Sequence, residues 1–427
     1  MSISFDSWNL PGPTGKVLLF ALTLVAAATA QADWAQWRGP ARDGISPEPL
    51  PTTLPEPPKL IWKLSVAHGY AAPVVTAGKL IYLDDAGGME TVHCVNSADG
   101  KEQWKNAFAE TYTDEFEPGP RCTPVVDEDR LYVQSCKGEF QCLNLTDGKV
   151  RWRFHFSDYG AFWVPEKNSP VGSANRRGNA GAPVIDGSRI IIQVGSTNGA
   201  SLCSFDKVSG KLLWKSQNDL TSYTSPVIGK LGGIRQVVTA TCDGLLALDT
   251  ENGTLCWRVP FKTGANRNVL TPILEGDTVT FASFTTGLRR LKVSGPGPEQ
   301  KVADEWFNKQ IRINLATPVL VGGYLYGLGG NKDYICVEAA TGKLKWSQPG
   351  FDAVASSISD GHRVLVANDI GEVILLEANP EKFTELGRFQ ACGKTFSHPA
   401  YAGGVVYIRD SRELTAWRVL ESPSPQR

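Results

Sequence analysis

The chain has 427 residues, and its 43 Lys and Arg against 44 Asp and Glu give a net charge of −1. This balance gives no indication of a nucleic-acid or membrane-surface binder, and 42% hydrophobic with 20% charged residues excludes a wholly disordered chain. The 43 Gly, 27 Pro and 12 Trp, beside 2 Met, favour an all-β protein rich in turns over a helical bundle.

Residues 1–32 are typical of a signal peptide. The uncharged apolar run from Val17 to Ala30 is shorter than the roughly 20 residues that span a bilayer. Small-residue cleavage sites end at Ala30 and Ala32, and no Cys follows the run to carry a lipid. The sequence therefore predicts an exported protein, periplasmic or secreted, without a membrane span and with a mature chain that begins near Asp33. The long stretch before the run, which contains Asp6, is also compatible with an uncleaved leader.

Residues 33–59 are rich in proline and are predicted to form an extended arm that lies against the folded domain. The arm begins with the segment Trp34-Ala35-Gln36-Trp37-Arg38-Gly39-Pro40-Ala41-Arg42-Asp43-Gly44. Residues 421–427 are predicted to be a disordered tail, which leaves residues 60–420 for one domain.

Residues 60–420 contain a repeat of about 40–60 residues, a period typical of propellers and solenoids. Each unit opens with a small residue, Pro and two aliphatic residues, and then shows a second strand, a third strand, a tight turn with Gly and a fourth strand that ends in Trp. Because Pro stands at a strand start and Gly in the hairpin, each unit is predicted to be a four-stranded antiparallel propeller blade. The openers contain Pro73, Pro124, Pro183, Pro226, Pro272, Pro318, the degenerate Ser356-Ser357-Ile358, and Pro399.

The repeats predict an eight-bladed β-propeller. Trp62 precedes the first opener, whereas no such Trp follows the last opener. The segment Leu60–Leu64 is therefore expected to supply the outer strand of the last blade, which closes the ring without an exposed sheet edge. The eight positions of this type are Trp62, Trp104, Trp152, Trp214, Trp257, Trp306, Trp346 and Phe389.

The repeats resemble the tryptophan-docking motif of the pyrroloquinoline quinone (PQQ)-like propeller superfamily. Cys142-Leu143-Asn144, Asp147-Gly148 and Trp152 form one of five good copies, while the blade with Trp306 carries an insertion and Phe389 replaces the last Trp. The segment Trp34–Gly44 likewise resembles the leader of exported PQQ-like repeat proteins. The resemblance implies that rings stack between neighbouring blades, with docking roles for Trp104, Trp152, Trp214, Trp257 and Trp346.

The superfamily contains quinoprotein dehydrogenases and non-catalytic scaffolds, among them the propeller lipoprotein of the outer-membrane β-barrel assembly machinery. The dehydrogenases hold PQQ and Ca²⁺ in the mouth of the ring, with a carboxylate base and often two adjacent cysteines over the cofactor. This chain has no adjacent cysteine pair and is short for that class. We therefore expect no catalytic residue, cofactor or metal, and the alternative is a PQQ-dependent alcohol or sugar dehydrogenase that uses the channel mouth with PQQ and Ca²⁺.

The nine cysteines do not suggest a disulfide framework, because their number is odd and several occupy equivalent repeat positions in different blades, as Cys94 and Cys142 do. Most are predicted to be small buried apolar residues, and a local Cys136–Cys142 pair stays open. The five histidines lack metal-ligand spacing; His68 and His398 precede openers, where solvated loop positions are favoured over positions that face the channel.

Two connections between blades are longer than the others, and both are predicted to lie on one face. The first, between Trp104 and Pro124, is acidic. The second, between Trp152 and Pro183, places an aromatic residue near an arginine pair, which suits recognition of an anion, a glycan or a peptide. Alternatively, this aromatic residue pins the loop and the arginines pair with the acidic loop. The candidate binding residues in the second connection are Trp163, Asn175, Arg176 and Arg177.

Polar residues recur just upstream of the inner strands and predict a basic rim at the channel mouth, which could cradle an anionic ligand, including PQQ. They are Arg121, Arg267, Asn268, Arg312, Asn314 and Lys394, each of which could also be a solvated loop end. A lectin-like propeller would need several exposed aromatic residues on one face, and the sequence offers mainly Trp163 and Tyr159. The favoured hypothesis is an exported, monomeric, non-enzymatic propeller that binds a protein or another polymer through the insertion-bearing face.

Overall fold

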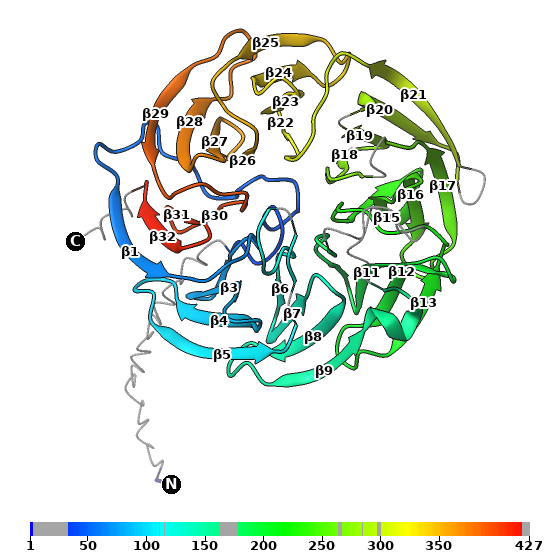
Figure 1. Cartoon of the computed structure of the whole chain (residues 1–427), viewed down its shortest axis with the longest axis horizontal. Coiled ribbons are helices and arrows are strands. Elements are labelled where there is room, and N and C mark those ends of the chain that lie inside the picture. Colours follow the sequence, from blue (N-terminus) through cyan, green and yellow to red (C-terminus); the bar gives the residue numbers. More distant parts are fainter. Residues whose placement is uncertain are drawn as a thin grey trace. The chain divides into compact units, whose positions relative to one another are not determined.

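Eight antiparallel sheets of four strands form the blades of a ring in the computed structural model (Figure 1). The structure describes residues 1–2, 33–110, 112–114, 116–162, 178–263, 267–283, 285–296 and 300–420, and the sheets are counted within these ranges. All eight sheets belong to the compact unit Gln31–Arg427. The predicted all-β, eight-bladed propeller is therefore confirmed.

Each blade is numbered in chain order and described from its innermost to its outermost strand. Blade 1 contains β2 (Val74–Thr76), β3 (Lys79–Asp85), β4 (Glu90–Asn96) and β5 (Glu102–Phe108); blade 2 contains β6 (Val125–Asp127), β7 (Arg130–Gln134), β8 (Glu139–Asn144) and β9 (Val150–His155). Blade 3 contains β10 (Val184–Asp186), β11 (Arg189–Ser196), β12 (Ala200–Asp206) and β13 (Leu212–Ser216); blade 4 contains β14 (Val227–Leu231), β15 (Ile234–Ala240), β16 (Gly244–Asp249) and β17 (Leu255–Pro260).

The second half of the chain repeats the pattern. Blade 5 contains β18 (Ile273–Glu275), β19 (Thr278–Ser283), β20 (Gly287–Ser294) and β21 (Lys301–Asn308); blade 6 contains β22 (Val319–Val321), β23 (Tyr324–Leu328), β24 (Tyr334–Glu338) and β25 (Leu344–Gln348). Blade 7 contains β26 (Ala355–Ser359), β27 (Arg363–Asn368), β28 (Glu372–Glu377) and β29 (Glu385–Gln390). Blade 8 contains β30 (Ala400–Ala402), β31 (Val405–Arg409), β32 (Glu413–Arg418) and, outermost, β1 (Lys59–Ser65).

The N-terminal strand β1 closes the last blade, as predicted. It pairs antiparallel with β32, with Leu64 opposite Leu414 and Lys63 opposite Thr415, and Figure 1 shows blue β1 beside red β32. Because β1 comes from the start of the chain and β32 from its end, their hydrogen bonds join the two ends of the ring and leave no open edge between the first and last blades.

Indole rings link neighbouring blades through the turn between the two outer strands. The Nε1 of Trp104 donates to the carbonyl of Leu145 in blade 2 at 3.0 Å, and a Cβ on Gly148 of the same turn would lie 2.4 Å from the ring. Equivalent bonds to the next blade are donated by Trp62, Trp214, Trp306 and Trp346. Trp306 therefore docks in the same way despite the insertion before it, and the β-bulge between Arg290 and Leu291 is equivalent to the one between Cys94 and Val95 in blade 1.

Two docking residues differ from this pattern in their polar contact. The ring of Trp152 lies against Gly210 of blade 3, but its Nε1 has no hydrogen-bond partner in the described part of the chain. Trp257 is buried and donates to Gln236 Oε1 of its own blade at 2.8 Å. Both rings still pack between blades, so the apolar contact is common to the set while the hydrogen bond is not.

The N-terminal arm enters the centre of the ring, where Figure 1 shows it as a blue loop. Trp34 forms an antiparallel bridge with Val75 of blade 1, and the chain then turns back on itself through a bond from Gly44 N to Arg38 O of 2.9 Å. We call residues 34–46 the plug. The arm leaves the centre along blades 7 and 8, where the Tyr401 hydroxyl donates to the Pro49 carbonyl. The plug is thus more compact than the extended arm that the prolines suggested.

The helix content is minimal in the part of the chain that the structure describes. It contains the short 3-10 helix η1 (Phe156–Tyr159), which follows β9. No helix found there is long and apolar enough to span a membrane.

Candidate ligand-binding site at the channel mouth

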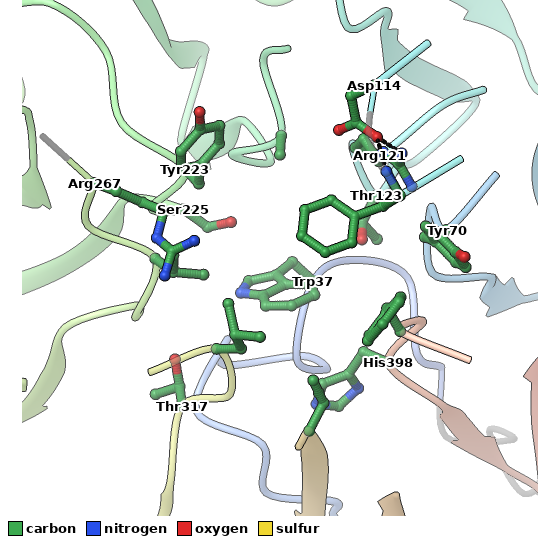
Figure 2. Close-up of a pocket in the computed structure, with 16 residues that line it drawn as sticks. Trp37, Tyr70, Asp114, Arg121, Thr123, Tyr223, Ser225, Arg267, Thr317 and His398 are labelled. Carbon is green, nitrogen blue, oxygen red and sulfur yellow. Dashed lines mark hydrogen bonds and ion pairs between the residues drawn. The ribbon is translucent and has the colours of Figure 1, made fainter. Parts of the chain in front are cut away.

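A cavity of about 240 Å³ opens at the end of the ring where the inner strands begin (Figure 2). The segments that lead into the first strand of all eight blades contribute to it, together with the tip of the plug. Its described lining is largely aromatic and aliphatic. The lining residues are Trp37, Tyr70, Asp114, Phe116, Arg121, Thr123, Ala180, Tyr223, Ser225, Arg267, Val269, Leu315, Thr317, Val354, Phe396 and His398.

Trp37 forms the floor of the cavity. Its Nε1 donates to Thr271 Oγ1 at 2.9 Å, and its ring meets that of His398 edge to face, with the centroids 5.2 Å apart. Burial, followed by repulsion from Arg38, lowers the pKa of His398 to about 3, so its imidazole is neutral at physiological pH. The floor is therefore an uncharged aromatic surface.

Two buried arginines attach the plug to the ring from below the floor. Arg38 and Arg42 donate to backbone carbonyls at the starts of inner strands, at distances between 2.5 and 3.1 Å. Burial lowers their pKa values to about 10 and about 9, so both stay cationic at neutral pH. The ring acceptors are Thr317 and Pro318 for Arg38, and Ala182, Pro183 and Pro226 for Arg42.

The acidic insertion between blades 1 and 2 forms one wall. Arg121 Nη2 donates to Asp114 Oδ1 at 2.9 Å and to the Glu117 carbonyl at 2.5 Å, while the guanidinium lies 4.6 Å from the centroid of the Tyr70 ring. The ion pair holds the insertion to the segment that leads into blade 2, and the cation–π contact joins this segment to Tyr70 beside blade 1.

An apolar collar surrounds the opening. Phe116 of the insertion is 48% exposed and lies 6.0 Å from Phe396 of blade 8, centroid to centroid. Phe396 also meets Tyr70 edge to face at 5.2 Å, and Leu315 on the blade 6 side is 37% exposed. Solvent-exposed side chains of this size, gathered at one opening, are typical of a surface that binds a partner or ligand.

The opposite wall carries a second guanidinium. Arg267 Nη2 donates to Asn314 Oδ1 at 3.1 Å, which connects blade 5 with blade 6. Figure 2 shows Arg267 and Tyr223 across the cavity from Arg121 and Tyr70, with the Trp37 ring between the two sides. The described lining thus holds two guanidinium groups and one carboxylate.

The donor set does not suit the Ca²⁺ and PQQ that the resemblance implies for dehydrogenases. Ca²⁺ takes about six to eight oxygen ligands. Asp114 is the one carboxylate in the described lining, and its two oxygens already accept bonds from Arg121 and the Tyr112 hydroxyl. Among the described residues, no group of three or more His, Cys, Asp or Glu is placed to hold a metal ion.

The predicted binding residues fall into four groups. Arg121 and Arg267 line the cavity, and Asn314 holds Arg267. Arg312 and Lys394 are exposed, and the Nζ of Lys394 lies 5.6 Å from the centroid of the Phe396 ring. Asn268 is fully buried, and its Nδ2 donates to the Thr241 carbonyl. Trp163, Asn175, Arg176 and Arg177 lie outside the described residues.

Sequence reasoning missed the aromatic part of the site. Trp37 was visible in the leader segment, but nothing local placed it in the channel. His398 was expected to be a solvated loop residue, and this is wrong: it is buried beneath the cavity because its ring packs on Trp37. The position of Tyr70, Tyr223 and Phe396 two or three residues before an opener was the signal that could have identified them.

The remaining reactive residues are structural. All nine cysteines lie among the described residues and are free and buried, so the Cys136–Cys142 pair is not formed. His93 stacks on Tyr82 at 4.5 Å, and its two ring nitrogens lie 3.0 Å from carboxylate oxygens of Asp84 and Glu102. These contacts lie within blade 1, away from the cavity.

Comparison with known proteins identifies related sequences and folds. The family described as outer membrane protein assembly factor BamB matches residues 55–162, 88–297 and 163–382. A curated protein named outer membrane protein assembly factor BamB, from Moranella endobia (strain PCIT), is 27% identical over 239 residues, which cover 53% of this chain and 56% of that protein. The match therefore spans little more than half of the relative's length.

Solved structures with the same fold include a BamB protein and an alcohol dehydrogenase. BamB from Moraxella catarrhalis has a TM-score of 0.58 at 16% identity, covering 86% of this chain and 99% of that one. A quinohemoprotein alcohol dehydrogenase from Pseudomonas putida HK5 has a TM-score of 0.61 at 11% identity, covering 93% and 82%. At these identities the likeness establishes the propeller fold alone.

Proposed function

The chain belongs to the family described as outer membrane protein assembly factor BamB, and we propose that it is a non-catalytic propeller that binds a protein or another polymer through the face of the channel mouth. The family and the fold provide the premise, since propellers of this kind include binding modules as well as enzymes. The choice between the two comes from the site itself.

The observation that carries the proposal is the character of the mouth. The cavity is an aromatic recess above a plug, and exposed Phe116 and Leu315 extend its apolar surface outwards. The carboxylate in its described lining, Asp114, is engaged by Arg121 and is not poised as a general base. Such a surface favours association by apolar burial, with charged groups that orient the partner.

We further propose that the protein works outside the cytoplasm, in the periplasm or as a secreted protein, without a resident cofactor and as a monomer. The apolar run at Val17–Ala30 supports export. The relative from Moranella endobia carries the name of an outer membrane assembly factor, which agrees with such a location.

Site-specific photo-crosslinking tests the proposal. A photoreactive phenylalanine analogue replaces Phe116 at the mouth, and in a matched variant it replaces His362, which is exposed in the turn at the other end of blade 7. We expect discrete crosslinked adducts from Phe116 in cells and none from His362. Equal adducts at both positions, or none at either, would contradict a binding face at the mouth.

The dehydrogenase alternative has a direct assay. Purified protein is incubated with PQQ, Ca²⁺, an alcohol or sugar and a redox dye. We expect no dye reduction above the protein-free background, because the described lining supplies neither a free base nor a Ca²⁺ ligand set. Dye reduction that depends on PQQ and on the protein would overturn the non-catalytic assignment.

A further inference from the structure

We propose that the cavity at the channel mouth is a socket for a single large apolar side chain, aromatic or leucine-like, that a partner polypeptide presents beside an acidic residue. This inference rests on the proposed function, because it takes the mouth to be a protein-binding face. It adds the chemistry that the partner must have at its point of contact.

The first argument is that the socket is closed below. Trp37 covers the floor and bonds to Thr271, while Arg38 and Arg42 anchor the plug to carbonyls of three blades. A chain that enters from the mouth cannot thread through the ring. A partner can insert a protruding side chain and must then turn away across the rim.

The second argument is size and lining. The cavity of about 240 Å³ is smaller than the roughly 300–1,000 Å³ of sites that enclose whole small molecules. Its walls present the rings of Tyr70, Tyr223 and Phe396, and its floor presents Trp37. A buried aromatic or leucine anchor in such a pocket, ringed by weaker contacts, is how protein interfaces concentrate their binding energy.

The third argument is charge. The described lining holds the guanidinium groups of Arg121 and Arg267 against the carboxylate of Asp114. Lys394 and Arg312 are exposed beside segments that line the same opening. A partner with carboxylates next to its apolar anchor is complementary to this rim, whereas a partner with lysines there is repelled.

The occupant is part of another molecule and not the chain's own arm. The described residues of the arm lie beneath the floor and then run along blades 7 and 8, where Leu50 N bonds to Asp360 and Leu54 N to the Leu386 carbonyl. They are bonded there and do not reach over the rim.

The test uses three capped pentapeptides and saturation-transfer NMR, which detects weak ligands. The sequences are Gly-Asp-Phe-Asp-Gly, the same peptide with Ala in place of Phe, and the same peptide with Lys in place of both Asp residues. We expect saturation transfer centred on the Phe ring of the first peptide. The other two are expected to bind at least about tenfold more weakly, since one lacks the apolar side chain and the other lacks the carboxylates. Equal signals from all three would overturn the proposal.

Protein variants locate the binding. Val269→Phe places a ring inside the cavity from its half-buried wall, and Phe116→Ala removes one exposed ring of the collar. Both are expected to lower affinity for the first peptide at least about tenfold. Phe307→Ala, at a residue that is 38% exposed on the outer strand β21, is the matched control and should bind as the original protein does. Thermal unfolding verifies that each variant is folded.

The outcomes separate this inference from the proposed function. If Val269→Phe or Phe116→Ala binds the peptide unchanged, the socket assignment is wrong. If crosslinking from the mouth persists in Val269→Phe while the original protein binds none of the peptides, the face binds a partner by other contacts, and this inference alone fails. If Val269→Phe does not fold, Phe116→Ala decides, because Phe116 lies on the surface.

Discussion

Replacing Gly148 with alanine tests the indole docking that holds neighbouring blades together. Gly148 has φ of +70°, and a Cβ there would lie 2.4 Å from Cε3 of Trp104, a ring that donates to the Leu145 carbonyl of the same turn. Gly187 has φ of +58° in the turn between β10 and β11, and a Cβ there would have no atom of the described residues within 4 Å. The two glycines therefore have similar positive φ angles, but Gly148 lies against an indole ring and Gly187 does not.

Both substitutions carry the cost of a left-handed alanine, roughly 1–2 kcal/mol, partly offset by the smaller unfolded ensemble of alanine, about 0.4–1 kcal/mol. Gly148→Ala must also displace Trp104, which adds about 1–3 kcal/mol for overpacking. We expect Gly148→Ala to lower the free energy of unfolding by about 2 kcal/mol more than Gly187→Ala, measured by urea denaturation. In a Trp104→Ala background the extra cost should vanish. Equal losses in the two single variants would refute the docking role.

Three further predictions concern buried groups. Trp257→Ala should lower the free energy of unfolding by about 3–5 kcal/mol, because its ring is buried between blades, and a near-neutral change in urea denaturation would contradict this. The pKa of His398 is about 3 in the folded state and ordinarily 6.5, so the free energy of unfolding falls progressively as the pH is lowered from 6.5 to 3. His398→Phe should make this fall smaller, whereas His362→Phe, at an exposed residue, should leave it unchanged. Glu90 has two buried oxygens that find no hydrogen-bond partner among the described residues, and burial, then Glu110 and Asp85, raises its pKa. Glu90→Gln should raise the melting temperature at pH 8 and leave it nearly unchanged at pH 4, whereas an equal gain at both pH values would exclude a charge effect.

The ring could be predicted from the sequence because its determinants are local and repeat. An opener such as Thr123-Pro124 and a turn such as Asp147-Gly148 each act within one blade, and eight copies fix the number of blades. The closing strand followed from the position of Trp62 ahead of the first opener. Even the docking of Trp306, which the insertion obscured, obeys the same local turn geometry.

The floor of the site could not be predicted, because its contacts join residues that are far apart in the sequence. Arg38 bonds to Thr317 and Arg42 to Pro183, so no spacing within the leader reveals either partner. The rim was partly recognised, since Arg121 stands three residues before Pro124 and Arg267 five residues before Pro272, each just upstream of an inner strand. Asn268 stands one residue beyond Arg267 and is buried, which shows that alternation along a strand-like segment decides which neighbour reaches the cavity.

The use of arginine in the plug follows from what the centre of an eight-bladed ring exposes. Inner strands that surround an axis direct some backbone carbonyls into the channel, and each carbonyl left buried without a donor costs about 1–3 kcal/mol. An apolar plug would leave them unpaired. A guanidinium has five N–H donors in a rigid fork, so Arg42 alone satisfies carbonyls from blades 3 and 4, and Arg38 satisfies two in blade 6. The same bonds hold Trp37 near the mouth. The plug that fills the channel therefore also forms the floor of the cavity at the mouth.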